Sequence, residues 1–137
     1  MQDLEWKWVI IGAVIIIALN QATSFLLAEP VAVPLVLELG MLGGLLVFAL
    51  LIGLLSYFVG GVIVGRMSPG ETVREPAVAS LFAVGLNLVL NIAINGQVPS
   101  VLGIAIAAGL GFGLGLAGGK VGEAWQARSA PVQPAVD

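Results

Sequence analysis

Long runs of apolar residues dominate the chain, and short polar segments separate them. The first run, residues 9–27, holds no charged side chain. A helix needs about 20 apolar residues to cross the hydrocarbon core of a bilayer. This run therefore has the length of one membrane span. Trp6 and Trp8 precede it, at the position where aromatic side chains anchor a span in the interface.

The next apolar stretch, residues 31–65, is too long for one span, because a helix of this length would extend about 52 Å at about 1.5 Å per residue. Four residues that favour turns, helix starts or the interface mark its first part: Pro30, Pro34, Glu38 and Gly40. We therefore predict a short interfacial segment over residues 31–39 and a second span over residues 40–65.

Two further spans follow the most polar segment of the chain, residues 66–76. The third span is predicted over residues 77–94 and ends at a tight Asn-Gly-Gln-Val-Pro turn. The fourth is predicted over residues 101–119, with one or two further helical turns beyond it. The pattern thus predicts an all-α integral membrane protein with four transmembrane helices in an antiparallel bundle. We expect residues 1–128 to form one domain and residues 129–137 to form a flexible cytoplasmic tail.

The basic residues indicate how these spans are oriented. With four spans, all five fall on the same side of the membrane: Lys7, Arg66, Arg74, Lys120 and Arg128. The opposite side carries only the acidic Glu29 and Glu38. Basic residues near the ends of spans favour the cytoplasmic side. We therefore expect a multi-pass protein of the cytoplasmic (inner) membrane with both termini in the cytoplasm.

The composition restricts the chemistry that this protein can perform. Hydrophobic residues make up 59% of the 137 residues and charged residues 9%, against about 25% charged in soluble domains. The chain has no Cys and no His, which removes disulfides, the usual zinc and haem ligands, and nucleophile–histidine pairs. A net charge of −3 without a basic run gives no basis for nucleic-acid binding. We therefore predict a non-enzymatic protein with no cofactor and no metal.

Glycines recur four residues apart in two of the predicted spans. Gly111, Gly115 and Gly119 share one face of the fourth span, and Gly61 and Gly65 share a face of the second. Small residues at this spacing allow two membrane helices to approach closely. These faces either pack the four helices of one chain together, or also join the fourth helix to another copy or another subunit.

Polar residues inside the apolar runs form a second pattern. Asn87, Asn91 and Asn95 lie on one stripe of the third span, and Asn20 and Ser24 lie in the first. Both spans run outward, so these residues and Glu38 share the outer half of the bilayer. They either form hydrogen bonds that fix the helices relative to one another, or face a partner, or line an outward-facing polar pocket.

The central loop carries a resemblance to other proteins. Residues 65–72 read Gly-Arg-Met-Ser-Pro-Gly-Glu-Thr. This loop resembles one in small uncharacterised prokaryotic four-helix membrane proteins of similar length, and the resemblance extends to the hydropathy profile. It implies a prokaryotic cytoplasmic membrane and no particular activity. Arg66 and Arg74 are expected either to contact anionic headgroups, at about 1 kcal/mol each, or to dock a cytoplasmic partner.

Two functions are consistent with these patterns. The first is a non-enzymatic membrane subunit or scaffold, which assembles in the lipid bilayer through its glycine-rich helices into a homo-oligomer or a larger complex. The alternative is a small transporter or channel-forming protein, whose outward-facing polar cluster handles a cation, a proton or a small solute.

Overall fold

The computed structural model describes residues 5–68, 73–96 and 98–129. Within these ranges the chain is all-helical, as predicted, and contains no strand. The elements are α1 (Trp6–Leu27), the short π-helical segment η1 (Ala28–Ala32), α2 (Val33–Met67), α3 (Arg74–Asn95) and α4 (Val101–Ser129). Helix α4 continues beyond the predicted fourth span and includes Ser129, which the sequence predicts to lie in the tail. The remainder of that tail lies outside the described residues.

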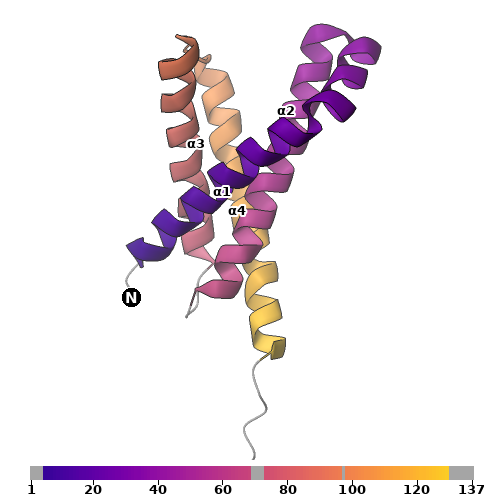
Figure 1. Ribbon diagram of the computed structural model, residues 1–137. Helices are drawn as coiled ribbons and strands as arrows, with labels where there is room; N and C mark the ends of the chain where they lie inside the picture. Colours follow the sequence, from indigo (N-terminus) through magenta and orange to yellow (C-terminus); the bar gives the residue numbers. More distant parts are fainter. Residues whose placement is uncertain (1–4, 69–72, 97, 130–137) are drawn as a thin grey trace, which may run out of the picture.

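Three helical stretches in the described part of the chain are long and apolar enough to cross a membrane: Trp6–Met67 with 62 residues, Arg74–Ile94 with 21 and Val101–Ser129 with 29. The first of these does not run straight. Figure 1 shows that the chain rises through α1, turns back after η1 and descends through α2.

The break in α2 lies at Gly40, where the sequence predicts the second span to begin. Its backbone angles, φ 76° and ψ 168°, are far from helical and are open essentially only to glycine. Four residues later, a Cβ atom at Gly44 would lie 2.5 Å from Cα of Val36. The segment before Gly40 therefore folds back tightly against the helix that follows it.

The helices are packed at one end of the molecule and separated at the other (Figure 1). We call the end with Trp6, Met67 and Arg74 the closed end, and the end with Leu27 and Val101 the open end. Gly12 lies beside Val64 near the closed end of α1 and α2. Towards the open end, α3 and α4 diverge from α1 and α2, so that the molecule has the shape of a V.

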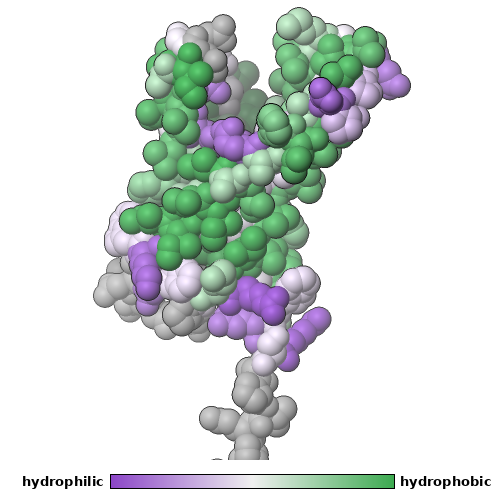
Figure 2. Space-filling view, in the orientation of Figure 1, coloured by the Kyte–Doolittle hydropathy of each residue, from purple (hydrophilic) through white to green (hydrophobic). Residues whose placement is uncertain are grey.

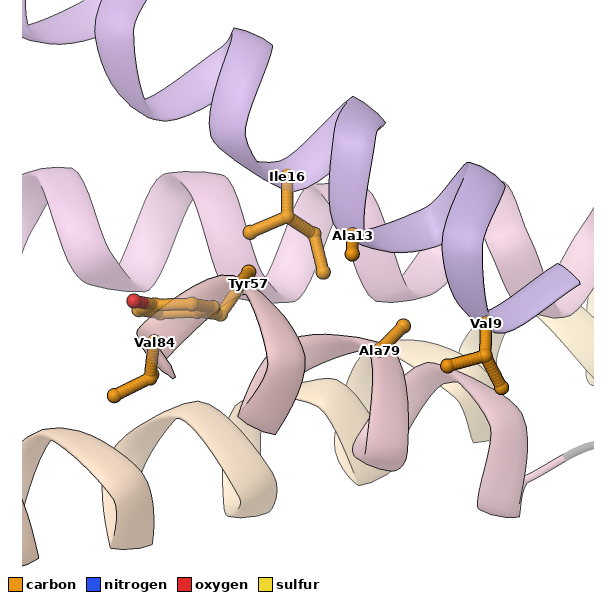
Figure 3. Packing of buried hydrophobic residues seen from close by; sticks show 7 residues of the cluster. Val9, Ala13, Ile16, Tyr57, Ala79 and Val84 are labelled. Carbon is orange, nitrogen blue, oxygen red and sulfur yellow. The ribbon is translucent and has the colours of Figure 1, made fainter. Parts of the chain in front are cut away.

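Few side chains are buried, and most of these are small. The hydrophobic core consists of Val9, Ala13, Ile16, Tyr57, Ala79, Ala83 and Val84 (Figure 3). Large apolar side chains point outward instead, for example Leu37 at 81% exposure and Val101 at 85%. Figure 2 shows hydrophobic residues over the middle of the visible face and over most of both arms, with hydrophilic residues mainly at the closed end. Such an exterior suits a chain whose solvent is lipid.

A buried carboxylate ties three helices together at the closed end. Glu75, in the first turn of α3, is only 5% exposed. One of its oxygens accepts a hydrogen bond from the backbone N–H of Glu5 at 3.1 Å, and the other accepts one from the Ser68 hydroxyl. Glu5 precedes α1 and Ser68 follows α2, so this one side chain fixes the ends of α1, α2 and α3. Its negative charge also lies at the N-terminus of α1, where the helix dipole favours an anion.

Candidate functional site

The glycines predicted to pack helices lie in contacts within the chain. A Cβ atom at Gly61 would lie 2.8 Å from the carbonyl oxygen of Gly115, and one at Gly65 would lie 2.6 Å from that of Gly119. These neighbours are backbone atoms, which cannot rotate away as a side chain can. Along this contact α2 and α4 run side by side in the same direction, with backbone against backbone.

The same face of α4 also contacts α3. A Cβ atom at Gly111 would lie 3.0 Å from Cγ2 of Val84, and one at Gly119 would lie 2.9 Å from Cγ of Pro76. Between these two positions, Gly115 packs against Ser80. The contacts advance by four residues along α4 while they retreat by four along α3, so these two helices are antiparallel.

Polar side chains from three helices meet where the V begins to open. The amide nitrogen of Asn20 in α1 donates a hydrogen bond to the Ser56 hydroxyl of α2 at 3.1 Å. Ser56 in turn donates to the carbonyl oxygen of Ile52. The next residue, Tyr57, forms a side-chain hydrogen bond with Asn87 of α3. Figure 3 shows the Tyr57 hydroxyl directed away from the Val9 end of the core. We call Asn20, Ser56, Tyr57, Asn87 and Asn91 the polar cluster.

Two adjoining cavities lie beside this cluster. The smaller has a volume of about 170 Å³, and its polar lining comes from Tyr57, Asn87 and Asn91. The larger, of about 570 Å³, is lined by Asn20, Tyr57 and otherwise apolar or small residues of α2 and α4. Both cavities are bordered by Tyr57, Gly103 and Ala107. In Figure 2, hydrophilic residues are visible at the base of the opening between the two arms of the V.

The polar residues predicted from the sequence are only partly brought together. Asn20, Asn87 and Asn91 border the cavities. Ser24 is half-buried and lines neither of them. Glu38 is exposed and also lines neither, so the pocket interpretation loses its predicted acidic residue. Asn95 ends α3, and its side chain lies outside the described part of the structure.

The two arginines of the predicted headgroup loop lie at the closed end. Arg66 is in the last turn of α2, and its guanidinium group lies 5.8 Å from the ring centroid of Trp125 in α4. Arg74 is exposed at the first residue of α3. The part of the loop between residues 69 and 72 lies outside the described ranges.

Sequence reasoning missed Ser56 and Tyr57, which connect the asparagines of two helices. A signal was present, because these are the only hydroxyl-bearing residues in the apolar run of residues 40–65. A polar group inside a span requires a partner. Two adjacent residues on a helix point in different directions. One such pair can therefore form hydrogen bonds with polar side chains on two neighbouring helices.

The chemistry available to the polar cluster is hydrogen bonding. Its amides and hydroxyls are uncharged and both donate and accept hydrogen bonds. They hold no acid–base pair of the kind that a hydrolytic mechanism uses. The arrangement is therefore suited to recognising a polar group within an apolar setting. In comparisons with known proteins, no family model matches the chain, and no curated protein and no solved structure matches it either.

Proposed function

We propose that this chain is a non-enzymatic, four-span integral membrane protein that binds a small molecule in the cleft between its two arms. One observation carries the proposal: polar residues from three helices meet beside two adjoining cavities, between helices that are otherwise largely apolar. Ligand sites commonly combine apolar walls with a few placed polar groups, in volumes of about 300–1,000 Å³. The larger cavity alone falls in this range.

The proposed topology has four spans because α1 and α2 form a hairpin. The basic residues all lie on helix segments towards the closed end, which the positive-inside rule assigns to the cytoplasm of a prokaryotic cell. Both termini are then cytoplasmic, and Arg66 and Arg74 lie at headgroup level. The cleft opens towards the outer leaflet. Asn20 lies about 21 Å along α1 from Trp6, which places the polar cluster within the hydrocarbon region.

Interhelical hydrogen bonding alone does not account for the cavities. The bonds of Asn20 to Ser56 and of Tyr57 to Asn87 are worth roughly 1 kcal/mol each in a membrane. They would hold the helices together equally well in a filled interface. Instead, small residues at Gly103 and Ala107 leave space beside the polar groups. This space supports binding over a purely structural role, and it is the feature that a small transporter would also require.

The test is the set of small molecules that remain with the protein when it is extracted in native nanodiscs. We expect mass spectrometry to find one molecule enriched over bulk lipid in the native protein. Ala107→Phe, which fills the junction of the cavities, should abolish the enrichment, and Asn87→Leu should reduce it. Gln21→Leu is the matched control, because Gln21 is exposed on α1 next to Asn20. If the native protein and the Ala107→Phe variant retained the same small molecules in equal amounts, the proposal would be contradicted.

A second candidate function, assembly into a homo-oligomer or with other membrane subunits, rests on another face of α4. Ala105, Gly109, Gly113 and Ala117 lie four residues apart, and all are exposed. Cβ atoms at Gly109 and Gly113 would meet no atom of the described residues within 4 Å. Gly61, Gly65, Gly111, Gly115 and Gly119 are already engaged within the chain. This second stripe is therefore the small-residue face left for a neighbouring helix.

The intact mass of the complex from the same nanodiscs tests the assembly. If α4 mates with another chain, Gly109→Leu with Gly113→Leu should release monomers. Gly85→Leu on α3 is the control, because a Cβ atom there also meets no described atom within 4 Å. If the native protein were monomeric, the assembly function would be excluded, and ligand binding in the cleft would remain as the proposed function.

A further inference from the structure

We infer that the cleft binds a membrane-soluble molecule with an uncharged, ring-sized polar head and a hydrocarbon tail, the chemistry of an alkylated quinone or quinol. The inference rests on the proposed function and names the class of its ligand. The small cavity would hold the head beside Tyr57 and Asn87, and the large cavity would hold the first part of the tail.

The size of the small cavity matches one six-membered ring. Its volume is about 170 Å³, and an apolar cavity of about 150 Å³ in another protein accommodates benzene. The small cavity also has the aromatic ring of Tyr57 in its wall, against which a planar head can stack.

The lining excludes a charged head. Among the residues that the structure describes, no charged side chain borders either cavity. An ion placed there would lose its hydration without gaining a counter-ion. The groups present are the Tyr57 hydroxyl and the amides of Asn87 and Asn91. An amide has two donors and two acceptor lone pairs, so its bond to Tyr57 uses only part of the capacity of Asn87. These groups match carbonyl or hydroxyl oxygens on a neutral ring.

The large cavity has the character of a tail site. Apart from Asn20 and Tyr57, its lining is apolar or glycine and includes Leu46, Leu50 and Leu54 of α2. These three leucines are also 58%, 54% and 49% exposed, so the same wall continues onto the outer surface of α2. A tail that lies along this wall can pass directly from the bilayer into the cavity. A ligand of this kind therefore enters from the lipid, not from water.

The variants for the experiment alter residues that border the two cavities. Ala107 borders both cavities, so Ala107→Phe should block the passage from head to tail. Asn87→Leu removes the amide that faces the head and keeps a similar volume. Tyr57→Phe keeps the ring and removes only the hydroxyl, and it replaces Asn87→Leu if that variant fails to fold. Gln21→Leu again serves as the matched control. Circular dichroism and size exclusion establish that each variant is folded.

The measurement is equilibrium binding of a decyl-substituted benzoquinone to the full chain in lipid nanodiscs, with empty nanodiscs subtracted. We expect saturable binding of one molecule per chain. Binding should be about tenfold weaker in Asn87→Leu or Tyr57→Phe, lost in Ala107→Phe and unchanged in Gln21→Leu. Decylbenzene, which lacks the oxygens, should bind about tenfold more weakly, and decanoate should not compete.

Three outcomes would overturn the inference. Equal binding of decylbenzene and the quinone would show that the polar cluster does not recognise the head. Competition by decanoate would show that a charge is tolerated. The absence of saturable quinone binding would mean that the class is wrong. If another molecule is nevertheless enriched in the native nanodiscs and lost in Ala107→Phe, the proposed function stands without this inference. If none is enriched, both fail.

Discussion

Glycine has a hydrogen atom where other residues have a side chain, and this determines how closely the helices approach one another. Gly65 faces the backbone of Gly119, and Gly60 faces the side chain of Ile16, so α2 meets α4 on one side and α1 on the other. In lipid, helices are held together by close packing and interhelical hydrogen bonds, because the acyl chains are as apolar as the side chains. A methyl group added at such a contact therefore removes attraction along a whole stretch of both helices.

Gly65→Ala should lower the stability of the native fold by roughly 1–3 kcal/mol, a typical cost of overpacking. The cause is the carbonyl oxygen of Gly119, 2.6 Å from the position of the new methyl group. At Gly85 a new Cβ atom would meet no atom of a neighbouring helix within 4 Å. Gly85→Ala should therefore leave the stability unchanged or raise it slightly, because a helix is more stable with Ala than with Gly. Unfolding of both variants by SDS in mixed micelles measures the difference. Equal stabilities would mean that α2 and α4 are not in backbone contact.

At the scale of elements, the most informative one is α2, which is a helix interrupted by a reversal of direction. Pro34 lies in its first turn, and Gly40 then breaks the helical path with a positive φ. After the break the helix continues to Met67 and carries Ser56 and Tyr57 to the centre of the molecule. The position of the break thus determines which residues of α2 face α1, α3 and α4.

Gly40→Ala should destabilise the protein by about 1–3 kcal/mol through backbone strain alone. A Cβ atom at Gly40 would meet no atom of another part of the described chain within 4 Å, so a clash with a neighbouring helix makes no contribution. The control is Gly53→Ala, in the regular part of α2, where the new methyl group makes ordinary contacts with the Tyr57 ring at 3.7 Å. Thermal unfolding in detergent should show a lower midpoint for Gly40→Ala only. A similar midpoint for both would mean that the chain does not adopt the positive φ.

At the scale of the whole molecule, the two ends of the structure differ in packing and in charge. Glu75 and the glycine contacts hold the closed end together, and the basic residues lie on the helix segments near it. At the open end the arms separate, and hydrophilic residues are visible at the base of the opening between them (Figure 2). If the closed end faces the cytoplasm, a ligand can reach the cleft only from the outer half of the bilayer.

Thiol labelling tests this orientation, because the chain has no Cys of its own. Val98→Cys and Ala127→Cys place single thiols at exposed positions near the open end and at the closed end. A membrane-impermeant maleimide should label Val98→Cys in intact cells and Ala127→Cys only after permeabilisation. The opposite pattern would invert the proposed topology. Neither substitution removes a charge, so neither alters the signal that orients the chain.

The site was less predictable than the elements around it. The stripe of Asn87 and Asn91 follows from helical spacing, and the depth of Asn20 follows from the direction of α1. The sequence predicts Glu38 in the same pocket because of its depth, but residues at one depth can lie on opposite sides of a helix pair. In the structure Glu38 is exposed and borders neither cavity. Depth in a bilayer can be read from position along a span, whereas direction around the helix axis depends on packing.

By itself, the sequence determined the helices, their breaks and the end at which the basic residues gather. These features are local, because they depend on the length of an apolar run, on Pro and Gly within a few residues, and on the charges that flank each run. Only the tertiary structure decided that Gly65 meets Gly119, that Tyr57 reaches Asn87, and that the arms leave a cleft. Several glycine faces offered equally good contacts along the chain, and the choice among them depends on the simultaneous fit of all the helices.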